Sequence, residues 1–443
     1  PLVEATFGRR NDRVPAPVLV SPRIGFSWTY GRAEEIMSFV GAAQAPRAVI
    51  RGGIGVFAST PGASQIGQVL DNTGLPDGTQ YLNCVGPAVP VPDWNAFAAS
   101  SGAVPDRCAD GTTGTVFSST SPNVTLFDPG FAPPRSVRSN VSWNGGVLDG
   151  RFNLNVDASW SLNLNQQRSL DLNFDATERF ALADDGRPVF VAPGSIVPAT
   201  GAIASRDARV SQEFARVTEL RSDLQSRTTQ ASIRLSPIAR GPTAFGWSLA
   251  YTFTHLREQV SGFSSTAGDP LTIEWARSGQ GPHQFNYSLR YRFFDAIQVN
   301  WNGTFRSGSA FTPMVAGDIN GDGYSNDRAF IPSPGGDAET AAALAQLLDN
   351  SSGSVRRCLE RQAGRIADRN SCRGPWTSTA NLNVTLDRAK FRMPHRAALS
   401  FSVSNPLGAA DLLVNGSGSL RGWGQGAMPD QSLLHVRGFD PET

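Results

Sequence analysis

Apolar and polar residues alternate without a break over residues 151–165. Successive side chains of a β-strand point to opposite faces, so this period of two predicts a strand with one apolar and one polar face. Strands of soluble proteins usually contain about five or six residues, whereas a tilted strand that crosses a bilayer needs about ten. The length of this run therefore favours a membrane-spanning strand.

The same alternation recurs along the chain. It is clear over residues 247–253, 284–293 and 297–306, where aromatic and aliphatic side chains oppose Asn, Gln, Ser, Thr and Arg. We therefore expect about ten antiparallel strands. Weaker copies of the pattern lie at residues 24–30, 50–57, 137–143, 229–235, 380–386 and 397–403.

The expected connections alternate between two lengths. Short turns on one rim and long loops on the other are typical of an outer-membrane β-barrel. We predict an all-β chain that forms part of a transmembrane antiparallel β-barrel in outer-membrane lipid, with short periplasmic turns and long external loops. A soluble sandwich or solenoid with very large loops is the alternative. The short connections are 145–150, 237–243, 294–296 and 387–395, and the long ones are 58–132, 166–226, 257–281 and 312–375.

Composition excludes two other classes of protein. The formal net charge is only +1, whereas nucleic-acid binding needs Lys and Arg clustered over one surface, so we expect no nucleic-acid partner. No window approaches the roughly 20 apolar residues that a membrane-spanning helix needs.

Helical character is expected only near residues 336–368, with helices over 341–348 and 355–366.

Three stretches carry a family resemblance. Residues 50–57 read IRGGIGVF, and residues 309–313 lead into GDINGDGYSNDR at 317–328. These stretches resemble the C-terminal barrel of TonB-dependent outer-membrane receptors, in particular the Oar-like branch with a carboxypeptidase-regulatory-like N-terminal domain. The third stretch is the tail, residues 358–376, 405–407 and 420–425.

The resemblance implies the organisation of the whole protein. Residues 1–443 would be the C-terminal part of one barrel domain, with the plug domain and the TonB-contacting box upstream of Pro1 and at least one strand beyond Thr443. The partners of the full-length protein would be TonB and a transported solute. Plugged transporters have about 22 strands, so we expect this segment alone not to form a closed pore.

Four cysteines form two local pairs inside loops rich in Gly, Pro and Asp. The shortest loops result from pairing Cys84 with Cys108 and Cys358 with Cys372, and such disulfides imply an oxidising compartment. Zinc is disfavoured because CxxC spacing and neighbouring His are missing. The first loop also contains Trp94 and Phe97, which suit either ligand capture or simple packing.

Residues 318–327 resemble the first half of a calcium-binding loop. Oxygen ligands fall at positions 1, 3 and 5, Gly follows at position 6, and a backbone carbonyl is available at position 7. Position 12 is Ala instead of Glu, which excludes a complete EF-hand. The alternative is a loop in which Asp and Asn accept hydrogen bonds from nearby backbone. The predicted calcium ligands are Asp318, Asn320, Asp322, Tyr324 through its carbonyl, and Asp327.

No catalytic motif is recognisable, so we do not expect an enzyme. The leading hypothesis is an outer-membrane receptor that takes up an unidentified solute. A surface adhesin or assembly scaffold on the same barrel is the second hypothesis, and a secreted β-protein that binds glycans is the third. The four histidines stand apart from one another in the sequence, at His255, His283, His395 and His435.

Overall fold

The structure is a computed structural model of the chain. His395 and part of the expected 387–395 turn lie outside the residues that it describes. The described residues are 2–10, 18–32, 46–60, 62–74, 84, 86–100, 105, 107–111, 121–238, 245–333, 338–387, 390–391, 394, 399–417, 421–424 and 430–440.

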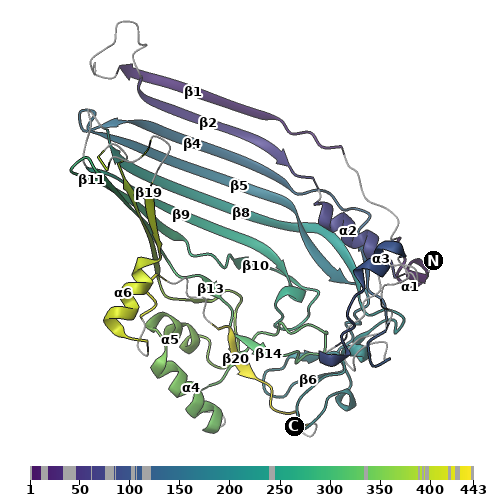
Figure 1. The fold of residues 1–443 in the computed structure, drawn as a ribbon. Helices are drawn as coiled ribbons and strands as arrows, with labels where there is room; N and C mark the ends of the chain where they lie inside the picture. The colour runs from purple at the N-terminus through teal and green to yellow at the C-terminus, as the bar shows by residue number, and fades with distance from the viewer. Residues whose placement is uncertain are drawn as a thin grey trace.

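Ten long antiparallel strands form one sheet in which each strand pairs with the next long strand of the chain. All ten strands expected from the alternation are confirmed, and several extend further at their loop ends (Figure 1). The strands in sheet order are β1 (Arg23–Arg32), β2 (Pro46–Ala58), β4 (Arg135–Val147), β5 (Phe152–Asp171), β8 (Val217–Pro237), β9 (Phe245–Ser261), β11 (His283–Phe293), β12 (Ile297–Arg306), β18 (Thr377–Leu386) and β19 (Leu399–Ser404).

The two faces of the sheet differ in chemistry. Cross-strand partners share a face, and one face joins Leu235 to Leu249 and Leu249 to Tyr287. We call it the outward face. Its side chains lack a protein layer: Leu249 is 51% exposed and Trp160 is 41% exposed. The opposite, inward face is polar, with pairs such as Asn300 with Asn383.

Short turns and long loops lie on opposite rims. The turn between β11 and β12 is tight, and Phe294 and Asp295 have φ angles of 51° and 53°. Two consecutive left-handed residues are typical of a type I′ turn, which matches the twist of paired strands. The loops that follow β2, β5, β9 and β12 gather at the other rim, where Figure 1 shows α2, β6 and β14.

The loop rim contains the buried apolar cores of the described residues. One core packs Phe174, Phe190 and Val191 together, and another packs Phe311, Ile331 and Leu359. The strands of the rim are β3 (Val124–Phe127), which runs parallel to β8, β10 (Ile273–Arg277), which extends along β9, and four short pairs: β6 (Phe180–Ala181) with β7 (Pro188–Val189), β13 (Ala310–Phe311) with β17 (Cys372–Arg373), β14 (Met314–Ala316) with β20 (Ser432–His435), and β15 (Phe330–Ile331) with β16 (Arg365–Ile366).

The helices correct one expectation. Helical structure is not limited to residues 336–368. Within that stretch α5 ends at Glu360, before the expected end at residue 366, because Arg365–Ile366 forms strand β16 and pairs with β15. The α-helices are α1 (Leu2–Phe7), α2 (Ala63–Asp71), α3 (Trp94–Ala99), α4 (Ala338–Asn350), α5 (Gly353–Glu360) and α6 (Pro406–Asn415), and short 3₁₀ turns lie at Gly86–Ala88, Pro193–Ser195, Ser205–Ala208 and Gly262–Ser264. Among the described residues, no helix has both the length and the apolar character needed to cross a membrane.

Two disulfides hold segments of the loop rim. Cys84 is bonded to Cys108, and Cys358 is bonded to Cys372, which are the pairs expected from the sequence. The second bond joins α5 to β17, and both of its cysteines are buried. Closing a loop of this length stabilises by roughly 3 kcal/mol in the chain-entropy model.

Candidate functional site

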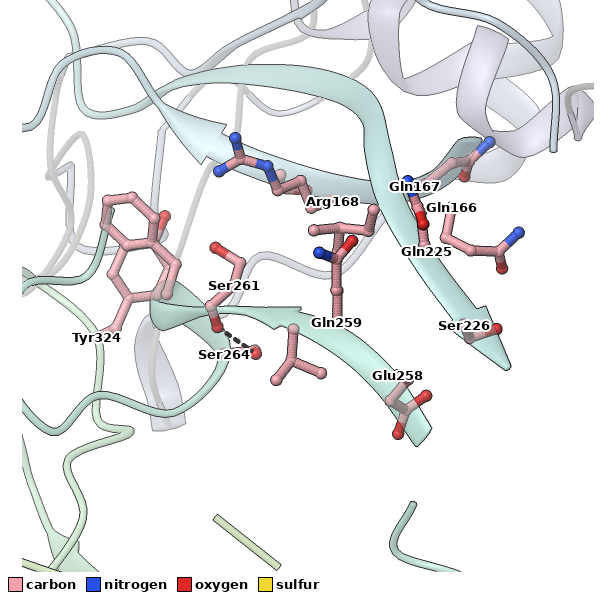
Figure 2. A pocket seen from close by; sticks show the side chains of 14 residues that line it. Gln166, Gln167, Arg168, Gln225, Ser226, Glu258, Gln259, Ser261, Ser264 and Tyr324 are labelled. Atoms are coloured by element: carbon pink, nitrogen blue, oxygen red, sulfur yellow. Dashed lines mark hydrogen bonds between the residues drawn. The ribbon is translucent and has the colours of Figure 1, made fainter. Parts of the chain in front are cut away.

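A cavity of about 410 Å³ opens where β8 and β9 separate. The two strands pair from Leu235 with Leu249 as far as Ser226 with Glu258, and no further. Beyond this point β8 continues beside β5, and β9 continues beside β10. The sheet therefore forks at the loop rim. Because the strands part, residues of both faces border the cavity (Figure 2).

Most of the residues that line this fork cavity have polar side chains. In Figure 2, Gln259 and Ser261 on β9 lie across the space from Arg168 on β5 and Gln225 on β8. The side chain of Arg168 is only 8% exposed, and its Nε and Nη2 each donate to Asp223 at 2.7 Å. This bidentate pairing neutralises the arginine and fixes its orientation.

Several buried polar atoms at the cavity lack a partner. Within the described residues, seven buried side-chain nitrogen or oxygen atoms make no hydrogen bond, and three of them belong to cavity-lining residues. They are Arg168 Nη1, a donor, Gln259 Oε1, an acceptor, and Ser261 Oγ, which can be either. An unsatisfied buried polar group costs about 1–3 kcal/mol. A ligand that offers both donors and acceptors would remove this cost after small side-chain rotations.

An aromatic wall closes the cavity toward the loops. The ring centroids of Tyr324 and Phe263 are 5.2 Å apart, and both residues line the cavity. The Arg216 guanidinium lies 4.1 Å from the Tyr324 ring centroid, a cation–π arrangement that holds the ring. Burial raises the pKa of Tyr324 to about 12, so its hydroxyl stays neutral at physiological pH.

The segment 318–327, which contains Tyr324, is hydrogen-bonded to two other loops of the rim. The Phe190 amide donates to the Asn320 carbonyl at 2.8 Å, and the Thr266 amide donates to the Asn326 carbonyl at 3.0 Å. The segment thus connects the loop after β5 with the loop after β9. We call residues 318–327 the hub loop.

The carboxylates of the hub loop accept hydrogen bonds from its own backbone. Asp318 accepts from the amides of Gly321 and Gly323 at 2.7 and 2.8 Å, and Asp322 accepts from the amide of Tyr324 at 2.8 Å. Gly321 has a φ of 78°, and a Cβ added there would lie 2.8 Å from Val191. These contacts are the ones expected if the Asp side chains stabilise turns of their own loop, which is the alternative to calcium binding.

A buried ion pair anchors the end of the hub loop. Arg187 Nη1 donates to Asp327 at 3.1 Å, and both side chains are fully buried. Arg187 also contacts Asp185 at 3.2 Å. The Ile319 amide donates to the second carboxylate oxygen of Asp327 at 2.9 Å. Because Arg187 has two carboxylate partners, its charge is compensated in the interior.

The hub loop holds more negative charge than Arg187 offsets. Burial raises the pKa of Asp318, and burial together with the charges of Asp318 and Asp327 raises the pKa of Asp322 to about 7. Burial also raises the pKa of Asp327 to about 6, although the Ile319 amide and Arg187 act in the opposite direction. Added positive charge near these carboxylates would favour their ionised forms.

The five predicted calcium ligands lie in one loop. In the part of the chain that the structure describes, no three His, Cys, Asp or Glu side chains are arranged to hold a metal ion. Calcium binding by Asp318, Asn320, Asp322, Tyr324 and Asp327 therefore stays a prediction from the sequence.

Sequence reasoning missed the partners of the site. Arg187 is 140 residues from Asp327 in the chain, and Arg168 and Gln259 line one cavity only because β8 and β9 separate. None of these residues stands in a recognisable local motif. The predicted Trp94 and Phe97 lie on α3, where they are 71% and 44% exposed.

Comparisons with known proteins give likenesses of fold at low identity. No protein-family model and no curated protein matches the chain. Similar solved structures include the outer membrane transporter YddB from Escherichia coli, with 7% identity over 82% of this chain and 35% of that chain and a TM-score of 0.40. Others are a variant of the ferric enterobactin receptor PfeA from Pseudomonas aeruginosa (10% identity, 87% and 34% coverage, TM-score 0.37) and the siderophore receptor PirA from Acinetobacter baumannii (11% identity, 87% and 36% coverage, TM-score 0.37). The chain spans about a third of the length of these structures.

Replacing Arg187 with Met would leave Asp327 buried without its main cationic partner. Removing one member of a buried ion pair typically costs about 3–5 kcal/mol. We expect a loss of this size in the free energy of opening of the hub loop, measured by amide hydrogen exchange. The double variant Arg187→Met with Asp327→Asn should lose clearly less, and equal losses in the two variants would contradict the charge argument.

The calcium prediction can be checked by the same measurement. If the hub loop binds calcium, millimolar calcium should slow amide exchange over residues 318–327 relative to excess chelator, and magnesium should not. The amides around Cys358 provide an internal control. Identical exchange in calcium and in chelator would end the metal hypothesis and leave the loop held by its Asx turns.

Proposed function

We propose that this chain forms part of the wall of an outer-membrane β-barrel that takes up a small polar solute. The single observation that carries the proposal is the outward face of the sheet. It is apolar over ten strands, rich in Phe, Tyr and Trp, and exposed along its length. An exposed apolar surface of this extent marks contact with lipid or a partner, because monomeric soluble proteins rarely expose one.

The dimensions of the sheet support lipid as the contact. Strands β5, β8 and β9 contain 20, 21 and 17 residues, well beyond the roughly ten that a tilted spanning strand needs. Aromatic side chains recur along the apolar band, and those at its ends suit membrane interfaces. At the turn rim, Trp143 Nε1 donates to the Tyr30 hydroxyl at 2.7 Å, and Phe152 packs on Trp247.

The inward face supports a hydrated interior. Its polar groups bond to one another across strands: Ser136 Oγ donates to Asn163 at 2.7 Å, and Asn163 Nδ2 donates to Ser226 at 2.9 Å. This polar surface leads to the fork cavity at the loop rim. The cavity is lined by the neutralised Arg168, the carboxylate of Glu258, amide and hydroxyl groups and an aromatic wall, a combination that suits a solute with several hydroxyl groups.

The remaining parts of the mechanism come from the sequence motifs. Residues 50–57 and 309–328 resemble TonB-dependent receptors of the Oar-like branch, and we propose that the full-length protein belongs there. In that case a plug domain and TonB would control entry of the solute, and transport rather than catalysis would be the activity.

An adhesin is the second candidate function, and one observation favours it. Helix α3 presents Trp94 and Phe97 at the loop rim, near the Cys84–Cys108 disulfide, and both aromatic side chains are exposed. Exposed aromatics on a restrained external loop suit attachment to another surface. An adhesin would need no solute in the fork cavity.

The membrane placement predicts unequal losses of stability for arginine at two neighbouring residues of β9. Leu249 lies in the middle of the outward band, and Leu249→Arg should destabilise the full-length protein in bilayers by about 2–4 kcal/mol, measured by urea unfolding from vesicles. Ser248→Arg, on the inward face, is the matched control and should cost much less. Similar losses for both variants would refute the assignment of the lipid face.

Transport predicts depletion of a solute from the medium. Host cells with and without the full-length gene would grow in a defined mixture of neutral mono- and disaccharides and polyols, and mass spectrometry would follow each compound. We expect one or more of them to be consumed only by cells with the gene, and Gln259→Leu to reduce this consumption. Ser248→Ala is the control. Equal consumption by all four strains would favour the adhesin.

A further inference from the structure

Three arginines form one row across neighbouring strands at the loop rim. Arg227 of β8 pairs directly with Arg257 of β9, and Arg257 pairs with Arg277 of β10. All three side chains are exposed. Like charges directly opposite each other on adjacent strands destabilise a sheet, so the row calls for negative charge from another source.

The residues that the structure describes do not supply that charge. Among the ion pairs of the described residues, none involves Arg227, Arg257 or Arg277. The neighbouring acid Glu258 lies on the inward face, because side chains alternate along β9. Burial and then the charge of Arg277 lower the pKa of Arg373, which adds a fourth arginine to the vicinity.

The row lies on the outward face, directly beyond the apolar band. Along β9 this face presents Phe253, then His255, then Arg257. Its side chains therefore change from apolar to basic within about 13 Å along the strand. Below the row, Phe253 packs on His283, and His283 stacks on Trp376 at 6.1 Å. The Arg227 guanidinium lies 5.2 Å from the Trp275 ring, which keeps it at the outer surface of β10.

We propose that Arg227, Arg257 and Arg277 form a binding site for the phosphate groups of membrane lipid headgroups. The inference rests on the proposed membrane placement, which puts this row at headgroup level on the loop side. Arginine is suited to the role because its planar guanidinium can donate two hydrogen bonds to one phosphate. Phosphate bound between the strands would also remove the repulsion within the row.

The test uses the full-length protein in a neutral detergent, titrated with phosphatidylglycerol and followed by native mass spectrometry. The triple variant Arg227→Gln, Arg257→Gln, Arg277→Gln should bind this lipid roughly 100-fold more weakly, given the usual contribution of each arginine near an anionic headgroup. Phosphatidylcholine, whose phosphate charge is balanced by the choline cation of the same headgroup, should bind the triple variant and the original protein equally weakly. The triple Arg→Lys variant keeps the charge but loses the paired hydrogen bonds, so its affinity should lie between that of the original protein and that of the triple Gln variant.

The matched control is the triple variant Arg234→Gln, Arg290→Gln, Arg292→Gln, which removes the same charge from the inward face and should bind phosphatidylglycerol normally. Equal affinity of the outward-face variant and the original protein, or an equal loss in both triple variants, would overturn the proposal. Displacement of the lipid by inorganic phosphate at equal concentration would also overturn it, because the site would then recognise free phosphate. Membrane placement is tested separately by Leu249→Arg, so failure of one proposal is distinguishable from failure of the other.

Discussion

In the proposed membrane placement, a backbone that crosses the hydrocarbon layer must find all its hydrogen-bond partners within the protein, and this constraint explains the form of the sheet. The eight inner long strands each pair with a long strand on both sides, which satisfies most of their amide and carbonyl groups within the sheet, and β1 and β19 at its edges each pair on one side. Polar side chains are then confined to one face. There they bond to one another, as in the run from Ser136 through Asn163 to Ser226. A slip of one residue would exchange the faces, which fixes the register.

The loop rim follows the rules of a water-soluble protein. It has apolar cores, two disulfides and buried ion pairs, and these features join loops that are distant in the sequence. Arg369 Nε donates to Glu274 at 2.9 Å, and Arg328 pairs with the same carboxylate. Together with the pair of Arg187 and Asp327, these contacts hold the hub loop and hence the Tyr324 wall of the fork cavity. The rigidity of the candidate binding site therefore derives from ion pairs outside the apolar band of the sheet.

Local patterns predicted the sheet well, because alternation over residues 151–165 or 284–306 is visible within each segment. Long-range features had no such signal: the fork cavity depends on where β8 leaves β9, and Arg187 finds Asp327 only after folding. Some missed helices did have a local signal. Asn405 caps α6 by accepting from the Gly408 amide, and Pro406 follows at the first helical position. Asp93 caps α3 in the same way through two amides.

The order of the ten strands along the sheet repeats their order along the chain. A hairpin can therefore be duplicated, lost or exchanged without rethreading any other segment, since only the two strands beside it change partners. The wall and the loop rim can consequently diverge at different speeds over evolutionary time. A lineage could acquire a new external specificity by exchanging the segment between two strands while it inherits the same scaffold.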